Sequence, residues 1–151
     1  MSFHLAMNLN KYPVVSTNDH MTYEFISAGP NGYIKKIVYY EAYGDNLYNL
    51  AFGDWSDFEQ SMNDKVRSNN HDRSKIIATV AGTVMDFIKR YPKAIVFAKG
   101  STPSRTRLYQ MGIHANWYEI NKLYVIEGFL NNEWVPFESN KNYQAFMCKA
   151  K

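Results

Sequence analysis

Residues 74–98, SKIIATVAGTVMDFIKRYPKAIVFA, decide the fold class because they join a long helix to a short strand. Up to residue 91 the apolar side chains recur every three or four positions, which is the period of an amphipathic helix. Pro92 ends this helix because proline cannot continue the hydrogen-bond ladder. The run AIVFA at 94–98 is apolar throughout, which is typical of a central strand buried on both faces. The helix stripe that we expect in the core consists of Ile76, Ile77, Val80, Val84, Phe87 and Ile88.

The segments before this unit have the composition of strands. Residues 21–27, 33–43 and 47–54 are rich in Tyr, Ile, Val and Phe, and the turn sequences GPNG and GDN separate them. Together they predict an antiparallel meander. A polar, acidic segment at 55–73 follows, and we expect it to contain a short helical turn or an ordered functional loop.

The segments after this unit predict one more helix and three more strands. The helix covers 103–113, or continues to 118. The strands at 122–130 and 133–137 flank an Asn-Asn pair and form a hairpin with a two-residue turn. The last predicted strand covers 143–149.

This order of elements, β-β-β-α-β-α-β-β-β, predicts an α+β fold. We expect a mostly antiparallel, twisted sheet of about six or seven strands, with two main helices on one face. The chain of 151 residues fits a single domain over 1–151, in which residues 1–20 form a tail.

The charges are unevenly distributed, although the net charge of +3 is mild. Between residues 54 and 64 the only charged side chains are acidic. The charged side chains between residues 87 and 118 are all basic, namely Lys89, Arg90, Lys93, Lys99, Arg105 and Arg107. This pattern indicates either two solvated surfaces of opposite sign or a basic face that binds an anionic partner.

Several classes of protein are disfavoured by what the sequence lacks. Cys148 is the only cysteine, so no intrachain disulfide or thiolate metal cluster can form, and a reducing cytoplasm is the expected location. The histidines have no metal-ligand spacing, and glycine-rich nucleotide motifs and nucleophile elbows are absent. Because there is no basic leader and no apolar run of ~18 residues, we expect neither export nor membrane insertion. We predict no metal, no cofactor and no catalytic residue.

The stretch KGSTPSRTRLYQ at 99–110 contains a well-specified helix start. Thr102 occupies the N-cap position, and Pro103 occupies the first helical position, where its missing N–H is harmless. Arg105 and Arg107 follow in the first turns, although the positive end of the helix dipole disfavours basic residues there. The two arginines therefore need a compensating interaction.

Two explanations for the arginines remain open. In the first, they pair with internal carboxylates such as Glu41, Glu119 or Glu127, or with the acidic loop. In the second, the strand end, the turn and the helix N-terminus converge on an anion such as phosphate. We predict that Arg107 is structural and that Arg105 faces the ligand. The candidate anion-binding residues are Lys99, Gly100, Ser101, Thr102, Arg105, Arg107 and Tyr109.

A second candidate surface lies in the segment 33–43. Lys35, Lys36, Tyr39 and Tyr40 would place aromatic rings beside cations, as in proteins on which bases stack. The alternative is that these tyrosines reflect strand propensity and core packing. Both faces of this strand are partly apolar, so periodicity does not select the buried one.

The stretch GSTPSRTRLYQ also carries a resemblance. Together with the preceding AIVFAKG and KIIATVAGTVMDFIKRYP, it resembles an uncharacterised family of short bacterial proteins, a domain of unknown function. The resemblance covers roughly residues 20–150, and the GST-x-x-RTRLY block is its most specific part. It implies no activity and no ligand. The residues that match the block are Gly100, Ser101, Thr102, Arg105, Arg107, Leu108 and Tyr109.

Three functions are compatible with these observations. The first is a small cytoplasmic binding protein whose basic face engages single-stranded nucleic acid or another polyanion. The second is a protein-interaction role, as a toxin–antitoxin component or a self-associating subunit, since acidic and basic regions could complement each other. The third and weakest is an enzyme acting on a phosphorylated small molecule, for which Glu119 and Glu127 are candidate bases only if the fold brings one of them close to Thr102 and Arg105.

Overall fold

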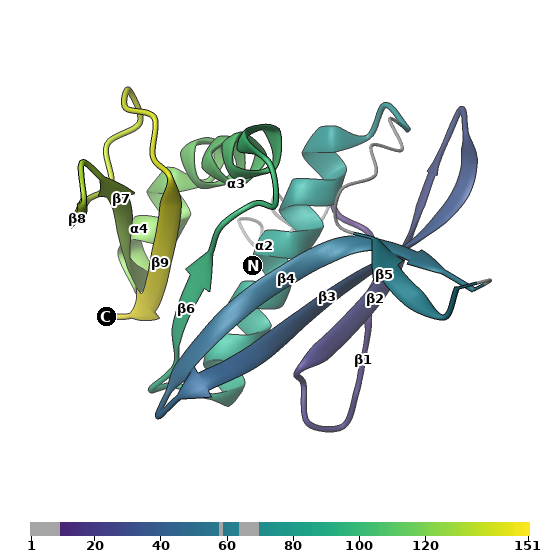
Figure 1. The fold of residues 1–151 in the computed structure, drawn as a ribbon, viewed down its shortest axis with the longest axis horizontal. Helices are drawn as coiled ribbons and strands as arrows, with labels where there is room; N and C mark the ends of the chain where they lie inside the picture. Colours follow the sequence, from purple (N-terminus) through teal and green to yellow (C-terminus); the bar gives the residue numbers. More distant parts are fainter. Residues whose placement is uncertain (1–9, 58, 64–69) are drawn as a thin grey trace.

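The computed structural model describes residues 10–57, 59–63 and 70–151, which form one nine-stranded sheet with three helices on one side of it (Figure 1). The strands are β1 (Val15–Ser16), β2 (Thr22–Gly29), β3 (Gly32–Gly44), β4 (Leu47–Ser56), β5 (Ser61–Asn63), β6 (Ile95–Ala98), β7 (Tyr124–Leu130), β8 (Glu133–Pro136) and β9 (Ala145–Ala150). The helices are α2 (Arg73–Arg90), α3 (Pro103–Ala115) and α4 (Trp117–Leu123). None of the described helices has the length and apolar character needed to span a membrane.

The strand order is β1-β2-β3-β4-β6-β9-β7-β8, and β5 pairs with β4. All neighbouring pairs are antiparallel except β4 and β6, which are parallel. The predicted α+β class and the mostly antiparallel sheet are therefore confirmed. The apolar run AIVFA contains β6, which lies between β4 and β9 in the interior of the sheet.

The number of elements differs from the prediction. The sheet has nine strands rather than six or seven, because β1 and β5 are too short to leave a periodic pattern in the sequence. The predicted second helix is divided into α3 and α4, so the described residues contain three helices rather than two. Asn116 lies at the division, where its backbone N–H and its side-chain amide both donate to the Gly112 carbonyl, at 3.2 and 3.0 Å.

The predicted tail, residues 1–20, contains an ordered part. Tyr12 is buried, its backbone N–H donates to Thr79 Oγ1 at 2.8 Å, and its hydroxyl donates to Asp72 Oδ2 at 2.6 Å. These bonds attach the chain to the start of α2. Residues 1–9 lie outside the described part, as do residue 58 and residues 64–69 of the predicted loop at 55–73.

The predicted hairpin around the Asn-Asn pair is confirmed. Asn131 and Asn132 join β7 to β8 and have φ angles of 53° and 65°. A two-residue turn with both residues in the left-handed region matches the twist of the flanking strands, and asparagine tolerates this conformation better than most residues.

The helices pack against the sheet through an aromatic core. Phe87 of α2 is fully buried and stacks on Tyr40 of β3, with ring centroids 4.1 Å apart and an interplanar angle of 6°. Tyr48 of β4 meets the same Phe87 ring edge-on at 4.9 Å. The Tyr40 hydroxyl is 2.9 Å from Thr83 Oγ1, which satisfies its polar group.

Alternation along β3 divides the predicted stacking residues between the two faces of the sheet. Lys36 and Tyr40 lie on the helix-covered face and are each 3% exposed. Lys35 and Tyr39 lie on the opposite, open face and are half-buried. The structure therefore does not bring these four residues together on one surface, because α2 covers the even-numbered positions.

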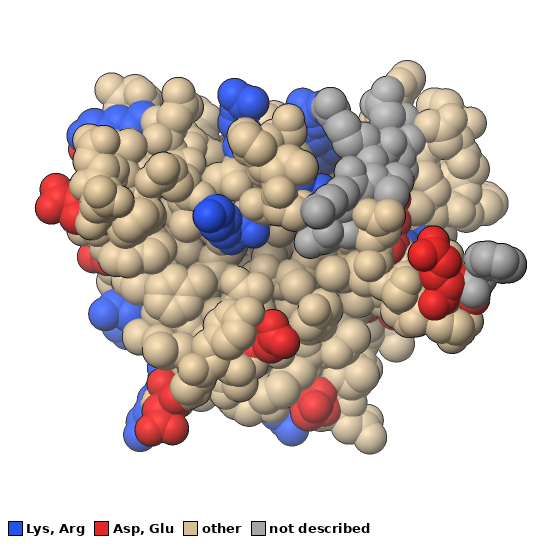
Figure 2. All heavy atoms as spheres, in the orientation of Figure 1, with Lys and Arg blue, Asp and Glu red and all other residues tan. Residues whose placement is uncertain are grey.

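The open face of the sheet carries an aromatic cluster of its own. Phe97 of β6 and Phe129 of β7 lie 5.6 and 5.1 Å from the Trp134 ring of β8, measured between ring centroids. Trp134 is 39% exposed. Figure 2 shows that the middle of this face carries few charged side chains, while Lys and Arg side chains gather above it, around α3.

Candidate functional site

A polar hollow of about 370 Å³ lies where β6 ends and α3 begins. Because β6 has only four residues, β4 on one side and the segment before β9 on the other extend beyond its end. The residues that line the hollow come from the β6–α3 loop, the first turns of α3 and the segment before β9: Lys99, Gly100, Ser101, Thr102, Pro103, Thr106, Arg107, Gln110, Asn142, Tyr143 and Gln144.

The loop wall of the hollow is fixed by short-range hydrogen bonds. The Thr102 side chain accepts from the Arg105 N–H at 3.2 Å, which confirms the predicted N-cap. The Gly100 N–H donates to Thr106 Oγ1 at 3.0 Å. A Cβ atom at Gly100 would lie 2.3 Å from the Thr106 backbone nitrogen, so the close approach of loop and helix requires glycine here.

The opposite wall is held by Gln110 and Tyr143. The Gln110 side-chain amide donates to the Lys141 carbonyl and accepts from the Tyr143 N–H at 3.4 Å. These two hydrogen bonds attach α3 to the segment before β9. The Tyr143 hydroxyl accepts from the Glu138 N–H at 2.8 Å and donates to the Pro136 carbonyl at 3.3 Å. Both walls of the hollow are thus shaped by the fold itself.

The two arginines lie in different surroundings, and of the two it is Arg107 that lines the hollow. Arg105 is half-buried, with its guanidinium carbon 5.0 Å from the Phe52 ring centre and Nη1 donating to the Phe52 carbonyl at 3.3 Å. Arg107 is exposed and lines the hollow, and it forms no hydrogen bond or ion pair with the described residues. Positions two apart on a helix diverge by about 200°, so only one of them can face the hollow.

A buried ion pair lies on the same face of β4 as Phe52. Lys36 Nζ contacts Asp54 Oδ1, and the two side chains are 4% and 13% exposed. Asp54 is two residues beyond Phe52 on β4, so the Lys36–Asp54 pair and Arg105 occupy neighbouring positions on the helix-covered face.

Five of the predicted anion-binding residues line the hollow, namely Lys99, Gly100, Ser101, Thr102 and Arg107. Tyr109 does not line it, because this side chain is buried beneath α3 and faces an apolar cavity. The residues that sequence analysis missed are Gln110 and the 142–144 segment. Gln110 lies within the 99–110 stretch but has no charge that would mark it, whereas the 142–144 segment is far from the loop in sequence and no local pattern connects the two.

The hollow has a positive electrostatic character. Lys99 and Arg107 are its charged members, and the described lining residues include no carboxylate and no histidine. Glu119, one of the carboxylates predicted to neutralise the arginines, lies 3.7 Å from Lys122 Nζ instead. Within the described part of the chain, no group of three or more His, Cys, Asp or Glu residues is placed to hold a metal ion.

Comparison with known proteins identifies the family of the chain. A family model described as "Family of unknown function (DUF6934)" matches residues 8–151, and the chain therefore belongs to this family. The expected membership in a family of unknown function is thus confirmed. Neither the curated proteins nor the solved structures contain a match to the chain.

Proposed function

We propose that this member of a family of unknown function binds single-stranded nucleic acid. The bound strand of nucleic acid lies along β6, on the open face of the sheet. The observation that supports the proposal is the proximity of Phe97 to Lys99. Phe97 lies in β6, and Lys99 follows two positions later in the loop directly after the strand. One belongs to the aromatic cluster and the other to the polar hollow.

The hollow suits a phosphate group. Backbone N–H groups at a helix N-terminus and the positive end of the helix dipole attract anions. Arg107 adds a planar guanidinium that can bond two phosphate oxygens at once. Because no described lining residue is a carboxylate, an anion in the hollow meets no local repulsion.

The aromatic cluster provides rings on which the bases of a nucleic acid can stack. Phe97, Phe129 and Trp134 are partly accessible on the open face, and base–aromatic stacking is largely independent of sequence. This cluster takes the place of the predicted stacking set, of which Lys36 and Tyr40 are buried.

Basic side chains flank the cluster at both ends of β6. Lys99 follows one end, while Lys93 precedes the other and Lys149 of β9 is paired in register with Ile95. Lys93 and Lys99 are six positions apart in the chain, and the four residues of β6 lie between them. A single strand would therefore meet cations at both ends of a stacking platform, which is the arrangement that non-specific single-strand binders use.

A binding role is favoured over an enzyme acting on a phosphorylated small molecule. General acid–base catalysis needs a titratable group within hydrogen-bond reach of the substrate. The described residues of the hollow include neither a carboxylate nor a histidine, the Tyr143 hydroxyl is bonded to the Glu138 N–H and the Pro136 carbonyl, and Glu119 is engaged with Lys122. Among the described lining residues, Lys99 is the remaining side chain that can exchange a proton. The proposed role of Arg107 is to hold the ligand.

Oligonucleotide binding tests the proposal directly. We expect a fluorescein-labelled single-stranded oligonucleotide to bind at low salt, with an affinity that falls steeply as salt rises. Trp134→Ala should weaken binding about tenfold or more, because a stacking contact is lost. Arg107→Ala should lower the slope of log affinity against log salt by about 0.7, because one phosphate contact is lost. Fluorescence anisotropy at several salt concentrations measures both quantities.

Lys122→Ala is the matched control, because Lys122 is an exposed cation on α4 that pairs with Glu119. Its affinity and salt slope should equal those of the wild type. Absence of binding at low salt would refute the proposal. Equal effects of Arg107→Ala and Lys122→Ala would show that only the net charge matters and that the hollow is not a site.

A second candidate function, self-association, is favoured by the same apolar face. Ile26 and Trp134 are 47% and 39% exposed there, and Figure 2 shows few charges in the middle of the face. Exposed aromatic side chains are enriched at protein interfaces. Light scattering between micromolar and millimolar protein concentration distinguishes the two functions. A dimer that Trp134→Glu dissociates would favour self-association, whereas a monomer throughout would exclude it.

A further inference from the structure

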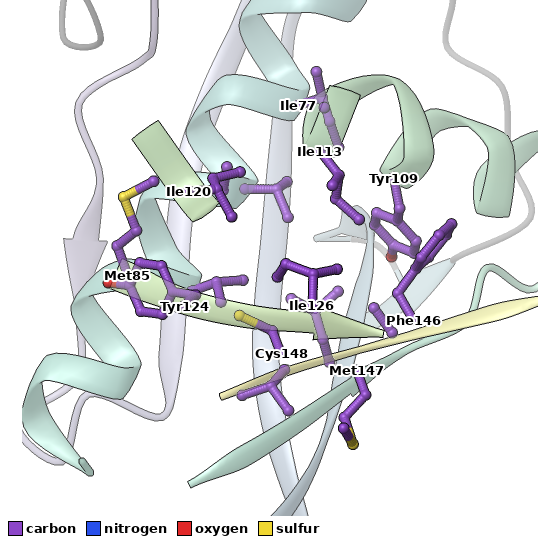
Figure 3. A pocket seen from close by; sticks show the side chains of 17 residues that line it. Ile77, Met85, Tyr109, Ile113, Ile120, Tyr124, Ile126, Phe146, Met147 and Cys148 are labelled. Carbon is purple, nitrogen blue, oxygen red and sulfur yellow. The ribbon is translucent and has the colours of Figure 1, made fainter. Parts of the chain in front are cut away.

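A separate cavity lies on the other side of the sheet, between it and the three helices. Its volume is about 90 Å³. Leu50 of β4, Val96 of β6, Ile126 of β7 and Cys148 of β9 form its floor, while α2, α3 and α4 form its walls (Figure 3).

The lining is apolar and uncharged. No Lys, Arg, Asp, Glu or His is among the described residues that surround the cavity. Burial raises the pKa of the Cys148 thiol to about 12, and burial also raises the pKa of the Tyr124 hydroxyl. These two polar groups are therefore neutral at physiological pH, and the cavity presents no charge to an occupant.

Contact between α2 and α3 closes one end of the cavity. At Gly112 of α3 a Cβ atom would lie 2.5 Å from Ile77 Cγ1 of α2, so the helices are in tight contact there. Figure 3 shows Ile77 and Ile113 at this end of the cavity and Met85 and Tyr124 at the other. Side chains of α2 and β7 thus bound the end away from this contact.

The wall on the helix side is only partly shielded from solvent. Leu50, Val96 and Ile126 are buried at the floor, whereas Met85 and Ile113 are half-exposed. Met85 has an unbranched, flexible side chain that can adjust to an entering molecule. An apolar molecule thus has a route into the cavity between the helices.

We propose that this cavity binds a small uncharged hydrocarbon group, of the size of one aromatic ring or a short alkyl chain. Apolar cavities exclude water, and engineered cavities of ~150 Å³ with Leu, Ile and Phe linings bind benzene or xenon. The present cavity is smaller, about 90 Å³, so a ring enters it only if a flexible lining side chain such as Met85 moves aside. An empty apolar cavity destabilises a protein in proportion to its volume, so an occupant that restores the missing contacts binds favourably. The site is independent of the proposed nucleic-acid surface, which lies on the opposite face of the sheet.

Benzene is the probe that we use to test this inference, because it has no charge or hydrogen-bonding group. At ten times its dissociation constant it should raise the midpoint of thermal unfolding by about 3–6 °C. In methyl NMR spectra the signals of Ile77, Ile120 and Ile126 should shift, because these side chains line the cavity. Ile26 and Ile95, on strands β2 and β6 and outside the cavity lining, should not shift.

Two filling variants and one control make the experiment decisive. Ala81→Leu on α2 and Ala98→Val on β6 each add methyl groups to the lining and should abolish the benzene effects. Ala78→Leu makes the same change three residues earlier on α2, outside the lining, and should retain them. Methyl shifts confined to the open face, or benzene effects that persist in both filling variants, would overturn the inference. So would the absence of any effect of benzene on the wild type.

Discussion

Replacement of Asp54 by alanine is expected to destabilise the protein by about 3–5 kcal/mol, the range observed when one partner of a buried ion pair is removed. The reason is that Lys36 Nζ contacts Asp54 Oδ1 on the helix-covered face, where the lysine side chain is 4% exposed. The substitution removes the carboxylate while the charge of Lys36 remains in a poorly solvated place. Chemical denaturation followed by circular dichroism measures the loss.

The chain provides a matched control on the neighbouring residue of the same strand. Lys35 Nζ lies 3.4 Å from Glu24 Oε2 on the open face, and these side chains are 34% and 43% exposed. Glu24→Ala should therefore cost only about 0–1 kcal/mol, as is usual for exposed pairs. The double variant Lys36→Met, Asp54→Leu should recover most of the stability lost in Asp54→Ala. Equal effects of Asp54→Ala and Glu24→Ala would contradict this prediction, because the buried charge of Lys36 would then not depend on Asp54.

The central elements could be predicted from the sequence because their patterns are long. The apolar stripe before Pro92 and the run at 94–98 predicted α2 and β6, and the Asn-Asn pair predicted the turn between β7 and β8. Strands β1 and β5 could not be predicted, because two or three residues are too few to show the alternation of apolar and polar side chains that indicates a strand. Their pairing is set by the neighbouring strand.

The candidate site was predictable only where it is continuous in sequence. The loop at 99–102 and Arg107 were identified because the cap and the unfavourable charges lie close together. The 142–144 segment was not, because tertiary structure alone brings it to α3. The sequence did not show which arginine lines the hollow, since spacing indicates that their directions differ but not which direction faces it.

The stacking surface was misassigned for a different reason. Apolar and basic residues occur on both faces of β3, so periodicity gave no preference for either. Phe87 of α2 covers Tyr40, and Lys36 is buried on the same face of the sheet. The aromatic residues that remain accessible come from β6, β7 and β8, which are separated in the sequence and combine only in the folded sheet.

Phe87→Ala is the second substitution with a large expected effect, a loss of about 3–5 kcal/mol. The Phe87 ring is fully buried and packs against Tyr40 at 4.1 Å, Tyr48 at 4.9 Å and Tyr91 at 5.0 Å between ring centroids. Its removal leaves a cavity that three bulky rings cannot fill without leaving their positions. Phe87→Leu should cost less, because most of the buried volume is kept. Denaturant titration of both variants measures the difference.

Phe97→Ala is the comparison that separates the aromatic residues of the core from those of the proposed binding surface. Phe97 is half-buried on the open face and contacts Trp134 at 5.6 Å between ring centroids, so its truncation should cost less stability than that of Phe87. The proposed function adds that Phe97→Ala weakens oligonucleotide binding in fully folded protein, because a stacking platform is lost. Unchanged binding by Phe97→Ala would contradict the proposed stacking surface, and a stability loss in Phe87→Ala no larger than that in Phe97→Ala would contradict the central place of Phe87 in the core.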